Sequence, residues 1–266
     1  MASDLAVLIA AYNSEATIQK AVNSIIDSGY PCDLFIVDDC SRIPVADVLG
    51  PVANVQVIRL AQNVGPARAS NVGLKQILEQ PYKYIARMDA DDASRPERFA
   101  KQIAFLEQHP DIGVVGAWGQ HFNERTGEPT IVSRTPISAK AVARRKYFNS
   151  PVINTTAMIR ADVFRDLGLL SVDYPAAEDY ELFRRIATRY QIANLPEVLI
   201  DICESIHGIS RSRRRRQVYD RLRIQLKYFE PLQWRAWAGI ATTLLLFLVP
   251  QKLVAKIKII FEKSLR

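Results

Sequence analysis

Three carboxylates, Asp89, Asp91 and Asp92, stand close together in the stretch "RMDADDASRPE" (87–97). They directly follow a run that is mainly apolar, "YKYIA", and precede a segment with helical spacing. Like charges this close repel each other, and the end of a strand does little to separate them. Carboxylates are hard oxygen ligands for magnesium and manganese, and these ions commonly hold substrate phosphates. The cluster therefore predicts a site for Mn2+ or Mg2+.

Two other interpretations of the acidic cluster can be weighed from the sequence. An EF-hand calcium loop that began at Asp89 would need glycine at its sixth position and glutamate at its twelfth, but Ser94 and Ala100 stand there. Alternatively, Asp92 or Ser94 could cap the helix expected to begin near Pro96. We expect one of them to do so, but three carboxylates are more than a cap needs.

The sequence has none of the standard loops that hold nucleotide phosphates. No Walker A sequence occurs, and "NVGPARASNVG" (63–73) does not fit the G-x-G-x-x-G pattern of dinucleotide-binding folds. A bound nucleotide would need other groups to hold its diphosphate. A metal ion at the acidic cluster, together with Arg68, could supply them.

The elements that must position these residues alternate between strands and helices, which predicts an α/β fold with a parallel sheet covered on both faces. The expected strands are 5–12, 33–39, 55–60, 82–89 and 112–118, and the expected helices are 15–28, 65–79 and 96–108. In such sheets, ligands bind beyond the carboxyl ends of the strands. The polar clusters "YNSE", "DDCS" and "DADD" follow three of the expected strands, so we expect them to border one crevice.

The pattern from about 120 to 210 is less regular. The expected elements are a polar hairpin (120–135), a basic segment (140–148), a strand (154–160), a helix (178–189) and a strand-like segment (197–207). No internal repeat or long flexible linker interrupts the chain. Residues 1–210 are therefore expected to form a single catalytic domain.

The charge of the chain is unevenly distributed. Residues 211–266 contain 14 Lys or Arg and 3 Asp or Glu, while the formal net charge of the whole chain is +7. The first 210 residues are therefore mildly acidic. This asymmetry indicates an anionic partner for the C-terminal segment rather than for the whole protein.

The same segment has features of a membrane-surface anchor. A basic helix (211–229) precedes an apolar run (237–249), which as a helix would be roughly 20 Å long, short of the ~30 Å hydrocarbon core of a bilayer. Trp234 and Trp237 suit the interface, and 251–266 has the amphipathic pattern of a helix in the membrane plane. The alternative is a helical pair packed on the body or in an oligomer interface.

The localisation follows from similar considerations. The three cysteines have no framework or C-x-x-C spacing, and the N-terminus lacks the basic region and cleavage site of a signal peptide. We expect a reduced, cytosolic setting. With the anchor, this predicts a peripheral or monotopic protein at the cytoplasmic face of the inner membrane.

An ordered set of motifs in this chain resembles the family 2 glycosyltransferases with the GT-A fold. The set covers roughly 4–210 and includes "LIAAYNSEATIQKAVNSI", "IVDDCS", "NVGPARASNVGL", "ARMDADDASRPERFAKQIAFLEQHPDIGVVG", "NTTAMIRADVFRDLG", "AEDYELFRRIA" and "LPEVLIDICESIHGIS". Each motif alone is weak, but their shared order is specific. The resemblance implies a Rossmann-like, mostly parallel sheet flanked by helices, with 211–266 as a basic helical extension.

The resemblance also implies roles for residues that bind the nucleotide sugar. Asp39, with Asp38 beside it, would receive a pyrimidine base, although both could instead form the turn before Ser41. Tyr12 and Glu15 would line the same pocket. Arg68 would approach the diphosphate or the base, with a surface salt bridge as its alternative. In the DXD motif, Asp89 would contact the ribose, Asp91 would ligate the metal, and Asp92 would support or cap.

The catalytic base would come from the pair Glu178–Asp179 at the start of a helix. We expect Asp179 to serve, with Glu178 as the fallback, although acidic residues also stabilise a helix N-terminus without catalysis. His207 matches a position where related enzymes supply a third metal ligand, but a lone histidine can equally be structural. Many relatives have arginine two residues before it, where this chain has Ser205. Any leaving-group contact from that arginine must come from elsewhere or be absent.

The expected function is an inverting, metal-dependent glycosyltransferase in surface polysaccharide synthesis. It would use a UDP-sugar, with dTDP-rhamnose as an alternative, and a saccharide acceptor that is lipid-linked. One rival is a nucleotidyltransferase acting on sugar phosphates, which would lack a Gly-rich N-terminal loop here and leave the Glu178–Asp179 helix without a role. Another is a nucleic-acid-binding protein using "RSRRRR", but this run leads into an apolar segment flanked by tryptophan, which suits lipid better. We therefore expect no nucleic-acid partner.

Overall fold

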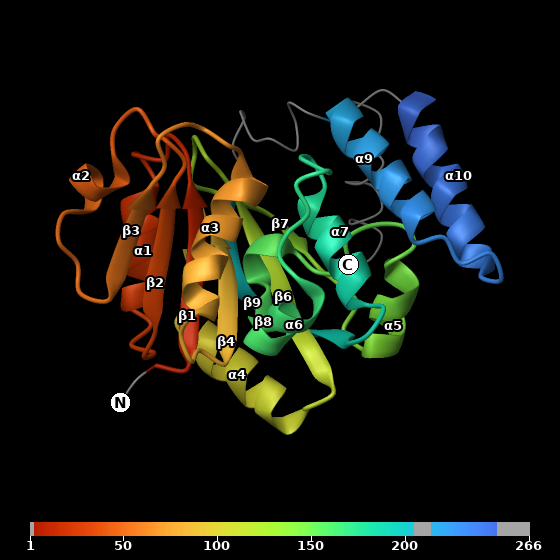
Figure 1. Ribbon diagram of the computed structural model, residues 1–266, viewed down its shortest axis with the longest axis horizontal. Coiled ribbons are helices and arrows are strands. Elements are labelled where there is room, and N and C mark those ends of the chain that lie inside the picture. The colour runs from red at the N-terminus through yellow and green to blue at the C-terminus, as the bar shows by residue number, and fades with distance from the viewer. Residues whose placement is uncertain (1–2, 205–213, 249–266) are drawn as a thin grey trace.

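The computed structural model describes residues 3–204 and 214–248, which form one sheet with helices on both faces (Figure 1). The strands are β1 (Leu5–Ala11), β2 (Asp33–Asp38), β3 (Val55–Arg59), β4 (Tyr84–Asp89), β5 (Ala93–Ser94), β6 (Ile112–Asn123), β7 (Pro129–Ser133), β8 (Met158–Arg160) and β9 (Gln191–Glu204). The helices are α1 (Ile18–Ile26), α2 (Val45–Leu49), α3 (Pro66–Leu78), α4 (Arg98–Gln108), α5 (Ala139–Arg145), α6 (Ala161–Leu167), α7 (Glu178–Ile186), α9 (Arg214–Lys227) and α10 (Trp234–Leu248), with a 3-10 turn, η1, at Asn154–Thr156.

The sheet has the strand order β3-β2-β1-β4-β8-β6-β9-β5, with β7 paired to β6. Strands β3, β2, β1 and β4 are parallel, so their carboxyl ends reach the same edge. The rest of the sheet is mixed, because β8 runs antiparallel to both β4 and β6 and β5 runs antiparallel to β9. The predicted parallel arrangement is thus confirmed for the half of the sheet where the polar clusters end their strands.

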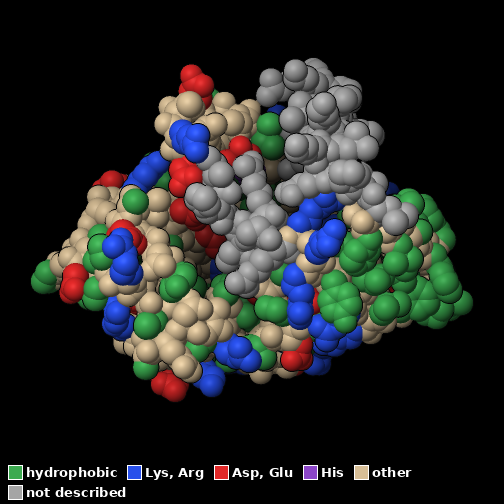
Figure 2. Space-filling view, turned by 90° about the horizontal axis from the view of Figure 1, so that it is seen from above, with side chains coloured by type: hydrophobic (Ala, Val, Ile, Leu, Met, Phe, Trp, Pro, Cys, Tyr) green, Lys and Arg blue, Asp and Glu red, His purple; other side chains and the backbone are tan. Residues whose placement is uncertain are grey.

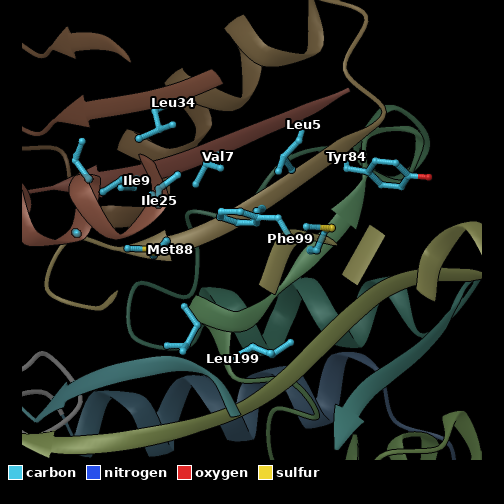
Figure 3. Packing of buried hydrophobic residues seen from close by; sticks show 14 of the residues in the cluster. Leu5, Val7, Ile9, Ile25, Leu34, Tyr84, Met88, Phe99 and Leu199 are labelled. Carbon is cyan, nitrogen blue, oxygen red and sulfur yellow. The ribbon is translucent and has the colours of Figure 1, made fainter. Parts of the chain in front are cut away.

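Alternate side chains of the strands fill two cores, one on each face of the sheet. Leu5, Val7 and Ile9 of β1 pack with α1, α2 and α4 in the core of Figure 3. Their neighbours Ala6 and Leu8 face the opposite side and pack with α3, α6 and α7. This alternation explains why the strands read as continuous apolar runs, since parallel strands buried on both faces have no polar side.

The C-terminal helices lie against the body of the molecule beside α7 and α5 (Figure 1). Buried Glu181 of α7 accepts hydrogen bonds from Lys227 (3.0 Å) and from the Tyr228 hydroxyl (2.6 Å). The helix predicted over 211–229 is confirmed for its described part, whereas the domain boundary at 210 stays a prediction. The amphipathic segment 251–266 lies outside the described residues. Within the described ranges, no helix is long and apolar enough to cross a bilayer.

Candidate active site

The carboxylates of the acidic cluster lie where β4 ends. Figure 2 shows a recess in which Asp and Glu side chains gather. The Asp89 amide donates to the Thr155 hydroxyl (3.1 Å), and one Asp89 carboxylate oxygen accepts a bond from the Asn154 side chain (3.3 Å). Both partners belong to η1, which therefore orients the first aspartate of the DXD motif. Burial, and then the charge of Asp91, raise the pKa of Asp89 to about 6.

Asp92 has a structural role that differs from the helix cap expected from the sequence. Its buried carboxylate accepts a hydrogen bond from the Cys203 amide of β9 (2.9 Å). The expectation that Asp92 or Ser94 caps the next helix is wrong, because α4 begins at Arg98, its N-cap is Glu97 without a side-chain cap, and Ser94 belongs to β5. Because β5 pairs with β9, the segment after the cluster is extended, and α4 begins only at Arg98.

The pKa values of all three aspartates are raised, although only Asp92 is buried, while Asp91 is half-buried and Asp89 is exposed. Burial, and then the charges of Asp89 and Asp91, raise the pKa of Asp92 to about 8, and burial also raises the pKa of Asp91. Low-dielectric surroundings and like charges both disfavour ionised carboxylates. A divalent cation at this position would remove that penalty, which is the behaviour expected of a metal site before metal binds.

Two buried arginines beneath the cluster partly balance it, and sequence reasoning missed both. Arg98 of α4 is fully buried, and its guanidinium donates to the Gln102 side chain (3.1 Å) and to the Arg87 carbonyl (2.9 Å). Burial lowers the pKa of Arg98 to about 9, against the opposing charges of Asp92 and Asp89. A signal was available: Arg87 interrupts an otherwise apolar strand, and buried cations are rare unless they are paired.

Glu178 and Asp179, the acid pair predicted to supply the catalytic base, are the first two residues of α7. Burial, and then the charge of Asp179, raise the pKa of Glu178 to about 7. Burial also raises the pKa of Asp179, but a hydrogen bond from the Tyr180 amide and the charges of Arg87 and Arg221 limit the rise. The charge of Asp179 in turn raises the pKa of Asp89, so the structure brings the pair and the DXD motif together.

By contrast, the carboxylate oxygens of Asp38 and Asp39, at the end of β2, all accept hydrogen bonds from other groups of the protein. Asp38 accepts hydrogen bonds from the amides of Ser41 (2.8 Å) and Val45 (3.2 Å) and from Arg59 (2.9 Å). Both carboxylate oxygens of Asp39 accept amide hydrogens, from Val64 (2.7 Å) and Gly65 (2.9 Å).

These contacts fix the two loops that follow β2 and β3. They agree with the turn-forming alternative. Direct contact of Asp38 or Asp39 with a base stays a prediction.

The two remaining pocket residues after β1 are an exposed tyrosine and a half-buried glutamate. The Tyr12 side chain is 53% exposed at the end of the strand. One Glu15 carboxylate oxygen binds Arg42 (2.8 Å), while the other is buried without a hydrogen-bond partner. The Arg42 hydrogen bond is the main cause of the lowered pKa of Glu15. An exposed aromatic ring offers a stacking surface, and an unpartnered carboxylate oxygen can accept from an N–H donor.

Arg68 lies in the first turn of α3 and lines a groove of about 750 Å3 between that helix and residues 169–173. It forms no ion pair or side-chain hydrogen bond with any described residue. The surface salt bridge considered from the sequence is therefore absent among those residues. Its contact with a diphosphate stays a prediction.

The donor set fits a divalent cation bound together with substrate. No cluster of three or more His, Cys, Asp or Glu side chains suited to metal occurs among the described residues, and His207 and Ser205 lie outside them. Asp89 and Asp91 supply two hard oxygen groups of raised pKa. Mg2+ and similar ions are commonly held by one or two carboxylates, with substrate phosphates and water completing the shell.

Comparison with known proteins agrees with this geometry. The sequence profile described as Glycosyl transferase family 2 matches residues 6–168. AmsE, an amylovoran biosynthesis glycosyltransferase of Erwinia amylovora, is 30% identical over 207 residues, which cover 74% of this chain and 74% of AmsE. An uncharacterized glycosyltransferase of Haemophilus influenzae is 28% identical over 220 residues, covering 77% of this chain and 66% of that protein, so this chain spans just under two thirds of that relative's length.

Two further similarities concern a named activity and the fold. WfaP of Escherichia coli, a UDP-Glc:alpha-D-GlcNAc-diphosphoundecaprenol beta-1,3-glucosyltransferase, is 28% identical over 188 residues, 70% of each chain. Residues 1–349 of S. aureus TarS in complex with UDP-GlcNAc match with a TM-score of 0.70 at 20% identity, covering 90% of this chain and 71% of that chain. The structural match confirms the predicted GT-A fold.

Proposed function

The chain belongs to glycosyl transferase family 2, and from this premise we propose that it transfers a sugar from a nucleoside-diphosphate sugar to a saccharide hydroxyl, with inversion, in the synthesis of a bacterial surface polysaccharide. One observation carries the proposal: the DXD carboxylates, which lack sufficient positive charge, face the acid pair of α7 across the recess. A metal-bound leaving group and a proton acceptor are the two things that this transfer requires. Neither role is needed for nucleic-acid binding.

The donor that these residues favour is a UDP-sugar, with a dTDP-sugar as the alternative. Tyr12 and the unpartnered oxygen of Glu15 offer a stacking surface and an acceptor for a pyrimidine. Arg68 is unpaired among the described side chains and available to a phosphate. WfaP uses UDP-Glc, which supports the same donor class.

The metal would be Mn2+ or Mg2+, with Asp91 as its ligand and Asp89 on the ribose. When bound, it would neutralise the charge that develops on the departing nucleoside diphosphate. The raised pKa of both aspartates supports this assignment, since each gains from a nearby cation. His207 as a third ligand remains a prediction.

Asp179 is the proposed base. It accepts the proton of the acceptor hydroxyl while that oxygen attacks the anomeric carbon from the face opposite the leaving group. The charges of Arg87 and Arg221 favour its ionised form, whereas Glu178 has a pKa of about 7 and is substantially protonated at neutral pH. The ionised member of the pair is the better proton acceptor at the start of the reaction.

Thermal unfolding with UDP, dTDP, GDP and CDP, each with and without Mn2+, tests the donor and metal assignments. A ligand at 100 times its dissociation constant stabilises the fold by about 2.7 kcal/mol. We expect stabilisation by UDP with Mn2+ only, lost in Asp91→Asn and kept in Asp47→Asn, an exposed acid on α2. Release of nucleoside diphosphate rather than pyrophosphate during turnover separates this activity from nucleotidyl transfer. Stabilisation independent of both Mn2+ and Asp91 would contradict the assignment.

The proposed acceptor is lipid-linked, and α10 is the proposed contact with an anionic membrane. Trp234 and Trp237 are 65% and 59% exposed, and Leu244, Leu245 and Phe247 continue the same apolar surface. This surface lies beside a band of Lys and Arg side chains (Figure 2). Aromatic and aliphatic groups next to cations are the composition that binds anionic bilayer surfaces. WfaP acts on a diphosphoundecaprenol-linked acceptor, which supports the same setting.

A charge inserted into the α10 surface tests this contact. Leu244→Glu/Leu245→Glu should abolish co-sedimentation with phosphatidylcholine–phosphatidylglycerol vesicles, because two carboxylates would enter the bilayer interface. Ile137→Glu changes an equally exposed apolar residue outside α10 and should leave sedimentation unchanged. If the wild type does not co-sediment with vesicles but forms a dimer in analytical ultracentrifugation, the apolar surface of α10 is an oligomer interface rather than a membrane contact.

A further inference from the structure

Three arginines converge between the proposed base and α10. Arg145 ends α5, while Arg214 and Arg221 belong to α9. The two α9 residues are about two helical turns apart and therefore project from the same side of the helix. Val218 and Gln225 lie on that side and are buried, so this side of α9 faces the body. Burial is the main cause of the lowered pKa of Arg221; the charges of Tyr180 and Asp179 oppose it, and those of Arg145 and Arg214 lower the pKa further.

Hydrogen bonds fix the positions of the elements that carry this arginine cluster (Arg145, Arg214 and Arg221). The Gln225 side chain of α9 donates to the Tyr147 carbonyl (2.8 Å), just after α5. Arg221 donates to the Asn149 side chain (2.9 Å), and the Tyr180 hydroxyl of α7 donates to the Lys146 carbonyl (2.7 Å). Segments 145–149, α7 and α9 are thus joined around the cluster.

The cluster lacks the carboxylate partners that neighbouring cations have. On α9, Arg216 pairs with Asp220 (3.0 Å) and Lys227 with Glu181 (3.0 Å). Among the described residues, neither Arg145 nor Arg214 forms an ion pair, and Arg221 donates only to the neutral Asn149. One Arg214 guanidinium nitrogen is buried without a hydrogen-bond partner. The charge of Asp179 acts on Arg221, but one carboxylate does not balance three guanidinium groups. Holding them together with too little negative charge is unfavourable, so the arrangement calls for a further anion.

The cluster has the proposed base on one side and α10 on the other. Burial raises the pKa of Asp179 and the Arg221 charge limits that rise, which identifies the two as electrostatic neighbours. On the far side, α10 packs so closely on the Tyr147 carbonyl that a Cβ at Gly239 would lie 2.0 Å from that oxygen. The apolar surface of α10 is on the same helix as Gly239. The order along the surface is therefore base, arginines and apolar helix.

We infer that Arg145, Arg214 and Arg221 bind the phosphate or diphosphate of the acceptor, the group that joins its saccharide to its lipid. Guanidinium groups bind phosphate oxygens through paired, charge-assisted hydrogen bonds. A saccharide hydroxyl would then reach Asp179 while the lipid extends toward α10. This inference rests on the proposed function. It differs from the donor site, whose diphosphate is expected at the DXD carboxylates.

Calorimetric titration with inorganic pyrophosphate in EDTA tests the site. EDTA removes the metal ion, so pyrophosphate should not bind at the DXD carboxylates of the donor site. Wild type should bind, and Arg145→Gln and Arg221→Gln should each weaken binding by about tenfold or more, as expected for lost hydrogen bonds to a charged group. Arg144→Gln is the matched control, since it removes the same charge from the neighbouring position of α5. Arg145 forms no ion pair with a described residue, so its replacement should leave the fold intact.

A second titration, with UDP and Mn2+, distinguishes the sources of the anion. The two variants should bind UDP with Mn2+ as wild type does. If the variants lose as much affinity for UDP with Mn2+ as for pyrophosphate, the arginines belong to the donor site and the inference is overturned. If they lose as much affinity for phosphatidylglycerol vesicles as for pyrophosphate, the arginines bind lipid headgroups and the inference is also overturned. A wild type that binds UDP with Mn2+ but not pyrophosphate would overturn the inference alone, whereas failure to bind UDP with Mn2+ would count against the proposed function.

Discussion

Two pairs of acidic residues lie at the same edge of the sheet, and the protein treats them in opposite ways. Burial alone would raise the pKa of Asp38, but hydrogen bonds from Ser41 and Val45 and the charge of Arg59 lower it. At α7, burial and mutual repulsion raise the pKa of Glu178 to about 7. The first pair has protein donors for its charge, while the second has too few. Sequence spacing alone makes both look like ligand sites.

The difference separates carboxylates that hold loops from carboxylates that await a ligand. A buried carboxylate with amide and guanidinium donors stabilises the fold and has little capacity left for substrate. A carboxylate of raised pKa in an open recess costs stability until a cation or a proton arrives. Substitution at the two pairs should therefore have opposite consequences for stability and for turnover.

The largest expected effect is on turnover in Asp179→Asn. Loss of a general base typically lowers the rate by ~10²–10⁴-fold, and the amide cannot accept the proton. The free energy of unfolding should be unchanged or higher, because a carboxylate of raised pKa is replaced by a neutral amide. Initial rates of nucleoside diphosphate release, measured beside UDP titrations, separate the loss of chemistry from a loss of binding.

Glu178→Gln is the control for that substitution. It removes the neighbouring carboxylate from the same helix end and should lower turnover far less. Near-normal turnover in Asp179→Asn with a severe loss in Glu178→Gln would exchange the two roles. Near-normal turnover in both variants would remove the base from this helix altogether.

A smaller effect, on stability, is expected in Asp38→Asn. The substitution replaces a carboxylate that accepts from two amides and Arg59, and hydrogen bonds to charged groups are each worth about 1.5–3 kcal/mol. We expect the free energy of unfolding to fall by roughly 2–4 kcal/mol in urea titrations. Asp47→Asn, at an exposed position nearby, should change it by less than about 0.5 kcal/mol. Equal stability of the two variants would contradict a structural role for Asp38.

Sequence patterns predicted the parallel strands and the crevice because these depend on local regularities. Apolar runs define β1, β2 and β4, and polar residues must follow them where the chain leaves the sheet. The short elements α2 and β5 escaped prediction, since neither contains enough residues to show a period. The same limitation led to the wrong cap at Asp92.

The partners of the site residues could not be predicted, because they are distant in sequence. Cys203 donates to Asp92 across 111 positions, and Tyr228 donates to Glu181 across 47. Charge averages also concealed Arg98, which lies in a helix of ordinary composition yet is fully buried beneath the cluster. Whether a charged residue belongs to the surface, the core or the site is decided by such long-range contacts.

The smallest expected effect is on the pH dependence of stability. The folded-state pKa of Glu178, about 7, exceeds its ordinary value of 4.5, so the folded protein binds more protons than the unfolded chain between these values. Stability should therefore fall as pH rises from about 4.5 to about 7. In EDTA, wild type should lose roughly 1–2 kcal/mol more than Glu178→Gln over this range, after allowance for solvent screening. For Asp38 the sign is opposite, since a lowered pKa stabilises the fold above its ordinary value. Parallel unfolding curves for wild type and Glu178→Gln across the range would mean that the α7 pair is as well compensated as the β2 pair, and the distinction between them would fail.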